Sequence, residues 1–150
     1  MLFDRMSGLD EKQLDELEER IAELLEEPWD KSTGRPREVT FREALVITSG
    51  YMRQNIVEDV WADIFDVDQS TISRIITFLT RLVEQAAAEF RPTPEEAAEA
   101  TRGAVAPVER AVASLKTWRI LFTDYRRPLK TFMSSFRAAI GLYFFKESFA

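Results

Sequence analysis

The sequence predicts an all-α fold, a helical bundle that contains a helix-turn-helix and ends in a C-terminal helical hairpin. Apolar residues recur at the three- and four-residue spacing of amphipathic helices along most of the 150-residue chain. No stretch shows the alternation of apolar and polar residues that is typical of strands. Proline, glycine or aspartate separates the apolar stripes, and these residues favour turns and helix ends.

The composition narrows the classes of function. A hydrophobic content of 45% with 31% charged residues is ordinary for a globular protein. The chain has no cysteine and no histidine, so disulfides, thiolate metal sites and the commonest general base are excluded. No apolar run approaches the roughly 20 residues of a membrane span. We expect a cytoplasmic protein with no membrane segment, no cofactor and no metal.

Charge divides the chain into three parts. The net charge of −6 is the sum of −7 over residues 1–32, −2 over residues 33–91 and +3 over residues 92–150. We expect an acidic amphipathic helix in the first part, a helix-turn-helix DNA-binding region in the second and C-terminal helices in the third. The acidity is concentrated at the N-terminus, so it does not exclude a local DNA-binding face elsewhere.

The first predicted helix covers residues 7–27 and has an apolar face opposite charged ones. Pro28 ends it, and the next helix begins at Thr40, which can form a capping box with Glu43. Gly50 weakens that second helix near its end. The apolar face of the first helix comprises Leu14, Leu17, Ile21, Leu24 and Leu25, and that of the second comprises Phe41, Leu45 and Thr48.

Two further helices separated by a very short turn make a helix-turn-helix. Asp66 stands where such a turn prefers glycine, and aspartate tolerates the left-handed conformation better than most residues. Val67 fills the turn, Asp68 can cap the second helix, and small Ala62 lets the two helices approach. The apolar stripe comprises Val57, Val60, Trp61, Ile64 and Phe65, and then Ile72, Ile75, Ile76, Leu79, Leu82 and Val83.

Polar residues cover the outer face at the start of the second of these helices. Amide and arginine side chains can reach base edges in the major groove, while hydroxyls and backbone N–H groups can bind phosphates. The alternative is a helical hairpin with a polar outer face, which is common in all-α proteins. The predicted DNA-binding residues are Gln69, Ser70, Thr71, Ser73 and Arg74.

The segment "TGRPRE", residues 33–38, gives a second and weaker signal. Proline restricts this stretch to an extended conformation, and extended arms with arginine can enter the minor groove. Arg35 and Arg37 are therefore candidate DNA contacts. A solvated loop is the favoured interpretation of so short a motif, although the position just before the helix-turn-helix strengthens the interpretation as an arm.

The C-terminal part predicts two helices separated by a break at "FTDYRRP". The first begins at Pro107 and the second is strongly aromatic. Aromatic and methionine residues at this spacing usually form a core. The first stripe comprises Val108, Val112, Leu115, Trp118 or Arg119, and Leu121 or Phe122; the second comprises Leu129, Phe132, Met133, Phe136, Ile140, Tyr143 and Phe144.

The chain resembles an insertion-sequence transposase of the Asp-Asp-Glu type in two separate regions. The stretch from "GRPREVTFREALVI" to "EEAAEATRG" resembles the N-terminal helix-turn-helix that such transposases use on DNA ends. The stretch "APVERAVASLKTWRILFTDYRRPLKTF" resembles their C-terminal helix and tail, and its "LKTWRILFTDYRRPL" run is quite specific. The resemblance implies that Glu109, in the "VER" motif, matches the third metal ligand of the family.

The resemblance also implies that the catalytic core is missing. The first two aspartates of the family lie on strands of an RNase-H-like sheet, and this chain has no room for that sheet between the two regions. We interpret residues 102–106 as a deletion seam. A single carboxylate cannot hold two metal ions for phosphoryl transfer, so we expect no enzymatic activity. Glu95, Glu96 and Glu99 fit a solvated helix face.

Two functions stay open. One is a non-catalytic, transposase-derived DNA-binding protein, such as a repressor that recognises transposon-end-like DNA. The other is a helical interaction protein that self-associates or binds an intact transposase. The acidic pI of about 4.9 favours the second, and the outer helix face favours the first. We also expect the aromatic C-terminal helices, left without a catalytic sheet, to pack either on the helix-turn-helix of the same chain or, as we favour, on a second chain in a homodimer.

Overall fold

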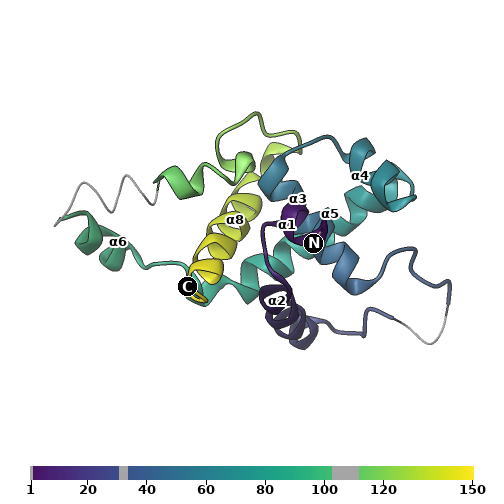
Figure 1. Cartoon of the computed structure of the whole chain (residues 1–150), viewed down its shortest axis with the longest axis horizontal. Helices are drawn as coiled ribbons and strands as arrows, with labels where there is room; N and C mark the ends of the chain where they lie inside the picture. The colour runs from purple at the N-terminus through teal and green to yellow at the C-terminus, as the bar shows by residue number, and fades with distance from the viewer. Residues whose placement is uncertain (1, 31–33, 103–111) are drawn as a thin grey trace.

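The computed structural model describes residues 2–30, 34–102 and 112–150, and all regular elements in these ranges are helical (Figure 1). Helices from both ends of the sequence pack around α5, and the described part contains no strand. The all-α fold class is confirmed. Within the same ranges, no helix combines the length and the apolar character needed to span a bilayer.

The N-terminal part contains two helices, α1 (Leu2–Ser7) and α2 (Glu11–Leu24), where one was predicted. Gly8, with a φ of +76°, turns the chain between them, and Asp10 caps α2 by accepting a hydrogen bond from the Gln13 backbone N–H at 2.9 Å. Helix α2 ends well before Pro28. Of its predicted apolar face, Leu14, Leu17 and Ile21 are buried, Leu25 is half-buried and Leu24 is exposed.

Helix α3 (Phe41–Gln54) is the most enclosed element of the fold, since every residue from Ala44 to Met52 is buried. The predicted capping box is confirmed: the Glu43 backbone N–H donates to Thr40 Oγ1 at 3.2 Å, and the Thr40 N–H donates to Glu43 Oε2 at 2.7 Å. Gly50 lies where a Cβ atom would be 2.5 Å from the Trp61 ring. Its small size thus brings α3 close to the next helix, at the expense of helix propensity.

Helices α4 (Glu58–Phe65) and α5 (Gln69–Ala86) follow, and then a short 3₁₀ turn, η1 (Ala88–Phe90). Helix α6 (Pro94–Thr101) extends away from the other helices (Figure 1). Glu95, Glu96 and Glu99 are all exposed on it, as predicted for a solvated face. The residues between Arg102 and Val112, which include Glu109 and most of the predicted seam, lie outside the described ranges.

The first predicted C-terminal helix ends earlier than expected. Residues 112–115 are helical, but the backbone leaves the helix at Trp118, which has a φ of −90° and a ψ of 85°. A 3₁₀ turn, η2 (Arg119–Leu121), follows. The predicted stripe through residue 122 was therefore wrong. Leaving the helix brings both Trp118 and Ile120 into the core, where they are 1% and 3% exposed.

A final 3₁₀ turn, η3 (Leu129–Thr131), leads into helix α8 (Phe132–Glu147), which packs along α5. The predicted aromatic stripe does not form its buried face, since Met133 and Phe136 are exposed and Leu129 is 81% exposed. Small side chains explain the difference, because they let α8 approach α5 more closely than aromatic rings would. The buried residues of α8 are Ser135, Ala138, Ala139, Gly141, Leu142, Tyr143 and Phe145.

This packing bears on the expected homodimer. Trp118 and Tyr143, which we expected to need a partner, are covered within the chain. The strip left without cover is smaller and comprises Leu129, Met133 and Phe136. The C-terminal segment thus packs on α3 and α5 of the same chain. The homodimer remains a prediction, and less exposed apolar surface supports it than expected.

Candidate nucleic-acid interface

A tight turn at residues 66–68 connects α4 to α5. Asp66 adopts the left-handed conformation, with a φ of 53° and a ψ of 50°, as its position in the sequence predicted. The Val67 N–H donates to the Ala62 carbonyl at 3.1 Å, and its half-buried side chain packs against the core. Asp68 occupies the N-cap position of α5 with an extended backbone, but its side chain makes no capping hydrogen bond. The expected side-chain cap is therefore absent.

Only part of the predicted stripe of α4 is buried. Trp61 is 1% exposed, and Phe65 packs against the edge of the core. Val57, Val60 and Ile64 are exposed, contrary to the prediction. A helix of eight residues presents only about two turns to its neighbours, and the large Trp61 ring takes the position against α3 that a broader stripe would have shared.

Helix α5 has two sharply different faces. The predicted apolar residues Ile72, Ile75, Ile76, Leu79 and Val83 are buried. The opposite face is exposed, and its charged side chains are Arg74 and Arg81, about 10 Å apart along the helix. The acidic residue of α5, Glu84, instead faces α8, where it accepts a hydrogen bond from Ser134 at 2.6 Å. The outer face of α5 is therefore basic, although the whole chain is acidic.

The structure brings most predicted DNA-binding residues to this face. Gln69, Ser70 and Arg74 are exposed, and Thr71 and Ser73 are half-buried. Sequence reasoning did not find Thr77, Phe78 and Arg81, which extend the same face by two turns. Their spacing from Arg74 could have revealed them, since residues three, four and seven positions apart share a helix face.

The two arginines of the predicted arm behave differently. The Arg35 side chain is 85% exposed and pairs with Glu38 at 2.9 Å. The Arg37 guanidinium lies 4.0 Å from the centre of the Trp29 ring, and its Nε donates to the Trp29 carbonyl at 2.9 Å. Arg37 thus anchors the segment to the fold, although both Arg37 and Arg35 are exposed to solvent.

The arm and α5 enclose a groove of about 390 Å³. Arg35, Arg37 and Glu38 line one side, and Ser70, Thr71 and Arg74 line the other. Thr71 donates its hydroxyl hydrogen to Glu38 at 3.2 Å, which joins the two sides. Segments that are more than 30 residues apart in the sequence therefore meet at one surface, as a combined DNA-binding site requires.

Carboxylates surround the turn and make its surface acidic. Glu38, Asp63, Asp66 and Asp68 line a shallow depression beside Val67. Their charges repel phosphates at the turn itself. Within the described ranges, no group of three or more histidine, cysteine, aspartate or glutamate side chains is arranged to hold a metal ion. The part of α5 that favours an anion therefore lies further along the helix, beside Arg74 and Arg81.

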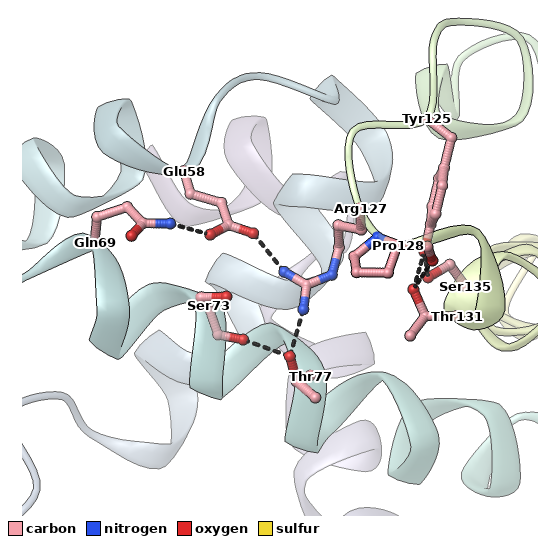
Figure 2. Close-up of polar contacts among 9 residues, drawn as sticks. All are labelled: Glu58, Gln69, Ser73, Thr77, Tyr125, Arg127, Pro128, Thr131 and Ser135. Carbon is pink, nitrogen blue, oxygen red and sulfur yellow. Dashed lines mark hydrogen bonds and ion pairs between the residues drawn. The ribbon is translucent and has the colours of Figure 1, made fainter.

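A buried ion pair connects this face to the C-terminal segment (Figure 2). Arg127 pairs with Glu58 at the start of α4, and the two side chains are only 8% and 16% exposed. Arg127 also donates to Thr77 on α5. The second oxygen of Glu58 accepts a hydrogen bond from the Gln69 amide at 2.5 Å. Sequence reasoning missed Glu58, Thr77 and Arg127, because nothing local links positions 69 residues apart.

Two further hydrogen-bond groups fix the loop that carries Arg127. Asn55, at the end of α3, donates to the Asp124 carbonyl at 2.9 Å. The Tyr125 hydroxyl lies 2.7 Å from the Thr131 hydroxyl and 2.9 Å from that of Ser135 (Figure 2). These hydrogen bonds fix the chain just before Arg127, at Asp124 and Tyr125, and attach it to Thr131 and Ser135, which follow Arg127.

No family model, curated protein or solved structure matches the chain. The resemblance to a transposase therefore stays a prediction from the residues quoted above.

Proposed function

We propose that the chain binds double-stranded DNA through the outer face of α5 and performs no catalysis on it. The basic outer face of α5 carries this proposal, since Arg74 and Arg81 are the charged side chains that α5 itself exposes there. In the groove beside Arg74, Arg35 is paired with Glu38, so its charge is partly compensated there. The left-handed turn at Asp66 supports an interpretation of α5 as the second helix of a helix-turn-helix, which is the helix that enters the major groove in such proteins.

The resemblance to transposases suggests the kind of DNA. A chain that retains the end-binding part of a transposase and lacks its catalytic core would act as a repressor on transposon-end-like DNA. It would occupy such ends without cleaving them. If the purified protein nicked DNA with Mg²⁺, and Glu109→Gln abolished the nicking, the non-catalytic part of the proposal would be wrong.

Fluorescence anisotropy with labelled duplexes tests the DNA-binding proposal. We expect Arg74→Ala and Arg81→Ala each to weaken binding and to reduce the slope of log affinity against log salt by about 0.9, as one phosphate contact is lost. Arg102→Ala is the matched control, because Arg102 is an exposed arginine at the end of α6. It changes the net charge equally but should leave the slope unchanged. Equal effects of all three substitutions would refute a specific face on α5.

Exposed apolar side chains favour a second candidate, an interaction protein that forms a homodimer or captures an intact transposase. Leu129, Met133 and Phe136 are spaced four and three residues apart and are all exposed. Sedimentation of the wild type against Met133→Asp/Phe136→Asp tests the homodimer. A wild-type monomer at tens of micromolar, by order of magnitude, would exclude a stable homodimer through this strip.

A further inference from the structure

The ion pair between Arg127 and Glu58 lies beside the DNA-binding face without being part of its surface. Both side chains are largely removed from water, so neither is placed to touch a base. Both oxygens of Glu58 are nevertheless engaged, one by Arg127 and one by the exposed Gln69. The pair is therefore placed to control the orientation of a side chain that can reach DNA.

The chemistry of the carboxylate determines which way the Gln69 amide points. An ionised carboxylate only accepts hydrogen bonds, so it must face the amide nitrogen of Gln69 and not its oxygen. The amide nitrogen has two hydrogens, and Glu58 takes one of them. The amide oxygen is turned away from Glu58 (Figure 2). Gln69 is left with one acceptor and one donor for other partners.

We infer that the Arg127–Glu58 pair presets Gln69 to read adenine in the major groove; this rests on the DNA-binding function proposed above. Adenine offers a donor at N6 and an acceptor at N7, which match the free oxygen and the remaining hydrogen of the amide. Guanine offers two acceptors, and thymine offers one acceptor and a methyl group. Cytosine can satisfy only the amide oxygen. Arg127 and Glu58 act as positioning residues, and Gln69 makes the contact.

Arg127 also neutralises the negative charge of Glu58. A free carboxylate beside Gln69 would repel DNA phosphates and could rotate away from the amide. The guanidinium holds the carboxylate through one oxygen and is itself held by Thr77. The orientation of a side chain on α5 thus depends on a residue of the C-terminal segment, 58 positions further along the sequence.

The test compares base preference in variants that keep the overall charge. Selection from a random duplex library first gives the duplex preferred by the wild type. Anisotropy then measures affinities for that duplex and for copies with each base, or with 7-deazaadenine, at the position that depends on Gln69. The key variant is Glu58→Leu/Arg127→Met, which removes one charge of each sign and leaves no unpaired buried charge.

We expect the wild type to favour adenine over guanine by about 5- to 150-fold, the range of one bidentate contact. Gln69→Ala and the double variant should both reduce this ratio to near one, and the double variant, which changes no residue that touches DNA, should leave the affinity for random DNA unchanged. Replacing adenine with 7-deazaadenine, which lacks the N7 acceptor, should weaken wild-type binding but not that of Gln69→Ala. Combining Gln69→Ala with the double variant should reduce the ratio no further.

A second variant covers the case in which the double variant fails to fold. Glu58→Gln keeps the shape of the side chain, although it removes one negative charge and leaves Arg127 without its ion pair. Because Arg127 only donates hydrogen bonds, the amide oxygen of residue 58 must face it, and the amide nitrogen then faces Gln69. The Gln69 amide must turn round to present its oxygen, so the adenine preference should again fall. Circular dichroism and thermal unfolding check that each variant is folded.

The outcomes separate the two proposals. If the protein binds DNA with the expected salt dependence but the folded variants keep the adenine preference, or the position read by Gln69 prefers another base, the positioning role is overturned and DNA binding stands. If no duplex binds better than random DNA and binding is insensitive to Arg74→Ala, both proposals fail.

Discussion

Substitution of Gly141 by alanine tests whether α8 packs on α5 of its own chain. Gly141 faces Ala87, the residue that ends α5. A Cβ atom at position 141 would lie 2.8 Å from the Ala87 Cβ, 3.1 Å from its carbonyl oxygen and 3.4 Å from its carbonyl carbon. Carbon atoms pack best about 3.5–4.0 Å apart. None of these three atoms can move aside by a rotamer change, so the backbones must separate.

Two effects of opposite sign determine the magnitude. Alanine at a helix interior is about 1 kcal/mol more stable than glycine through helix propensity. Overpacking a buried contact typically costs about 1–3 kcal/mol, and the rigid neighbours place this site near the upper end. We expect Gly141→Ala to lower the free energy of unfolding by about 1–2 kcal/mol. The corresponding fall in Tm is several degrees, since about 1 kcal/mol shifts the Tm of a chain of this size by 2–4 °C.

Urea unfolding followed by tryptophan fluorescence measures the change, because Trp29, Trp61 and Trp118 are all buried. Ala87→Gly removes the nearest of the opposing atoms. The double variant Gly141→Ala/Ala87→Gly should therefore be more stable than the sum of the single effects predicts. A rise in stability of about 1 kcal/mol on Gly141→Ala alone would mean that only the higher helix propensity of alanine acts and that no overpacking opposes it. The close packing of α8 on α5 would then be wrong.

Most substitutions destabilise a protein, but two others are expected to stabilise this one or to leave its stability unchanged. Asp66→Gly should stabilise the protein by about 1 kcal/mol and so raise the urea midpoint, because glycine adopts the left-handed conformation without a steric penalty. Asp66→Val should lower the urea midpoint. Equal midpoints for the two variants would refute a left-handed turn. Tyr51→Phe should be neutral or stabilising near pH 7, because the buried Tyr51 hydroxyl has no hydrogen-bond partner among the described residues. Burial raises the Tyr51 pKa from 10.0 to about 12, so between these pH values the unfolded state loses its proton first and the wild type loses stability as the pH rises. Tyr51→Phe should remove part of that alkaline loss, and identical pH profiles of the two proteins would contradict it.

The elements that sequence predicts best are those fixed by neighbouring residues. The capping box of Thr40 and Glu43, the left-handed Asp66 and the buried stripe of α5 all depend on contacts within a few positions. The outer face of α5 follows from the same periodicity. Most of the proposed DNA-binding surface can therefore be located from the amino-acid sequence alone.

The features that sequence could not predict depend on distant partners. Which face of α8 is buried depends on how closely α5 approaches, and Ala138 and Ala139 allow an approach that the more conspicuous Phe136 would prevent. Helix α1 is stabilised by α3, and nothing in its own six residues signals that contact. The pairing of Arg127 with Glu58 joins two charged residues that look solvent-exposed in isolation.

The isolation of α6 has a consequence for how the chain tolerates added sequence. A helix of eight residues with a capping box is too short to be stable by itself in water, and α6 has little packing to support it. Its amides should exchange with solvent far faster than those of α5. The contact between α5 and α8 forms without it, and each doubling of the length of a flexible connection costs only about 0.6 kcal/mol. The chain could accept another folded unit at this point, or lose one, while the rest of the bundle kept its packing.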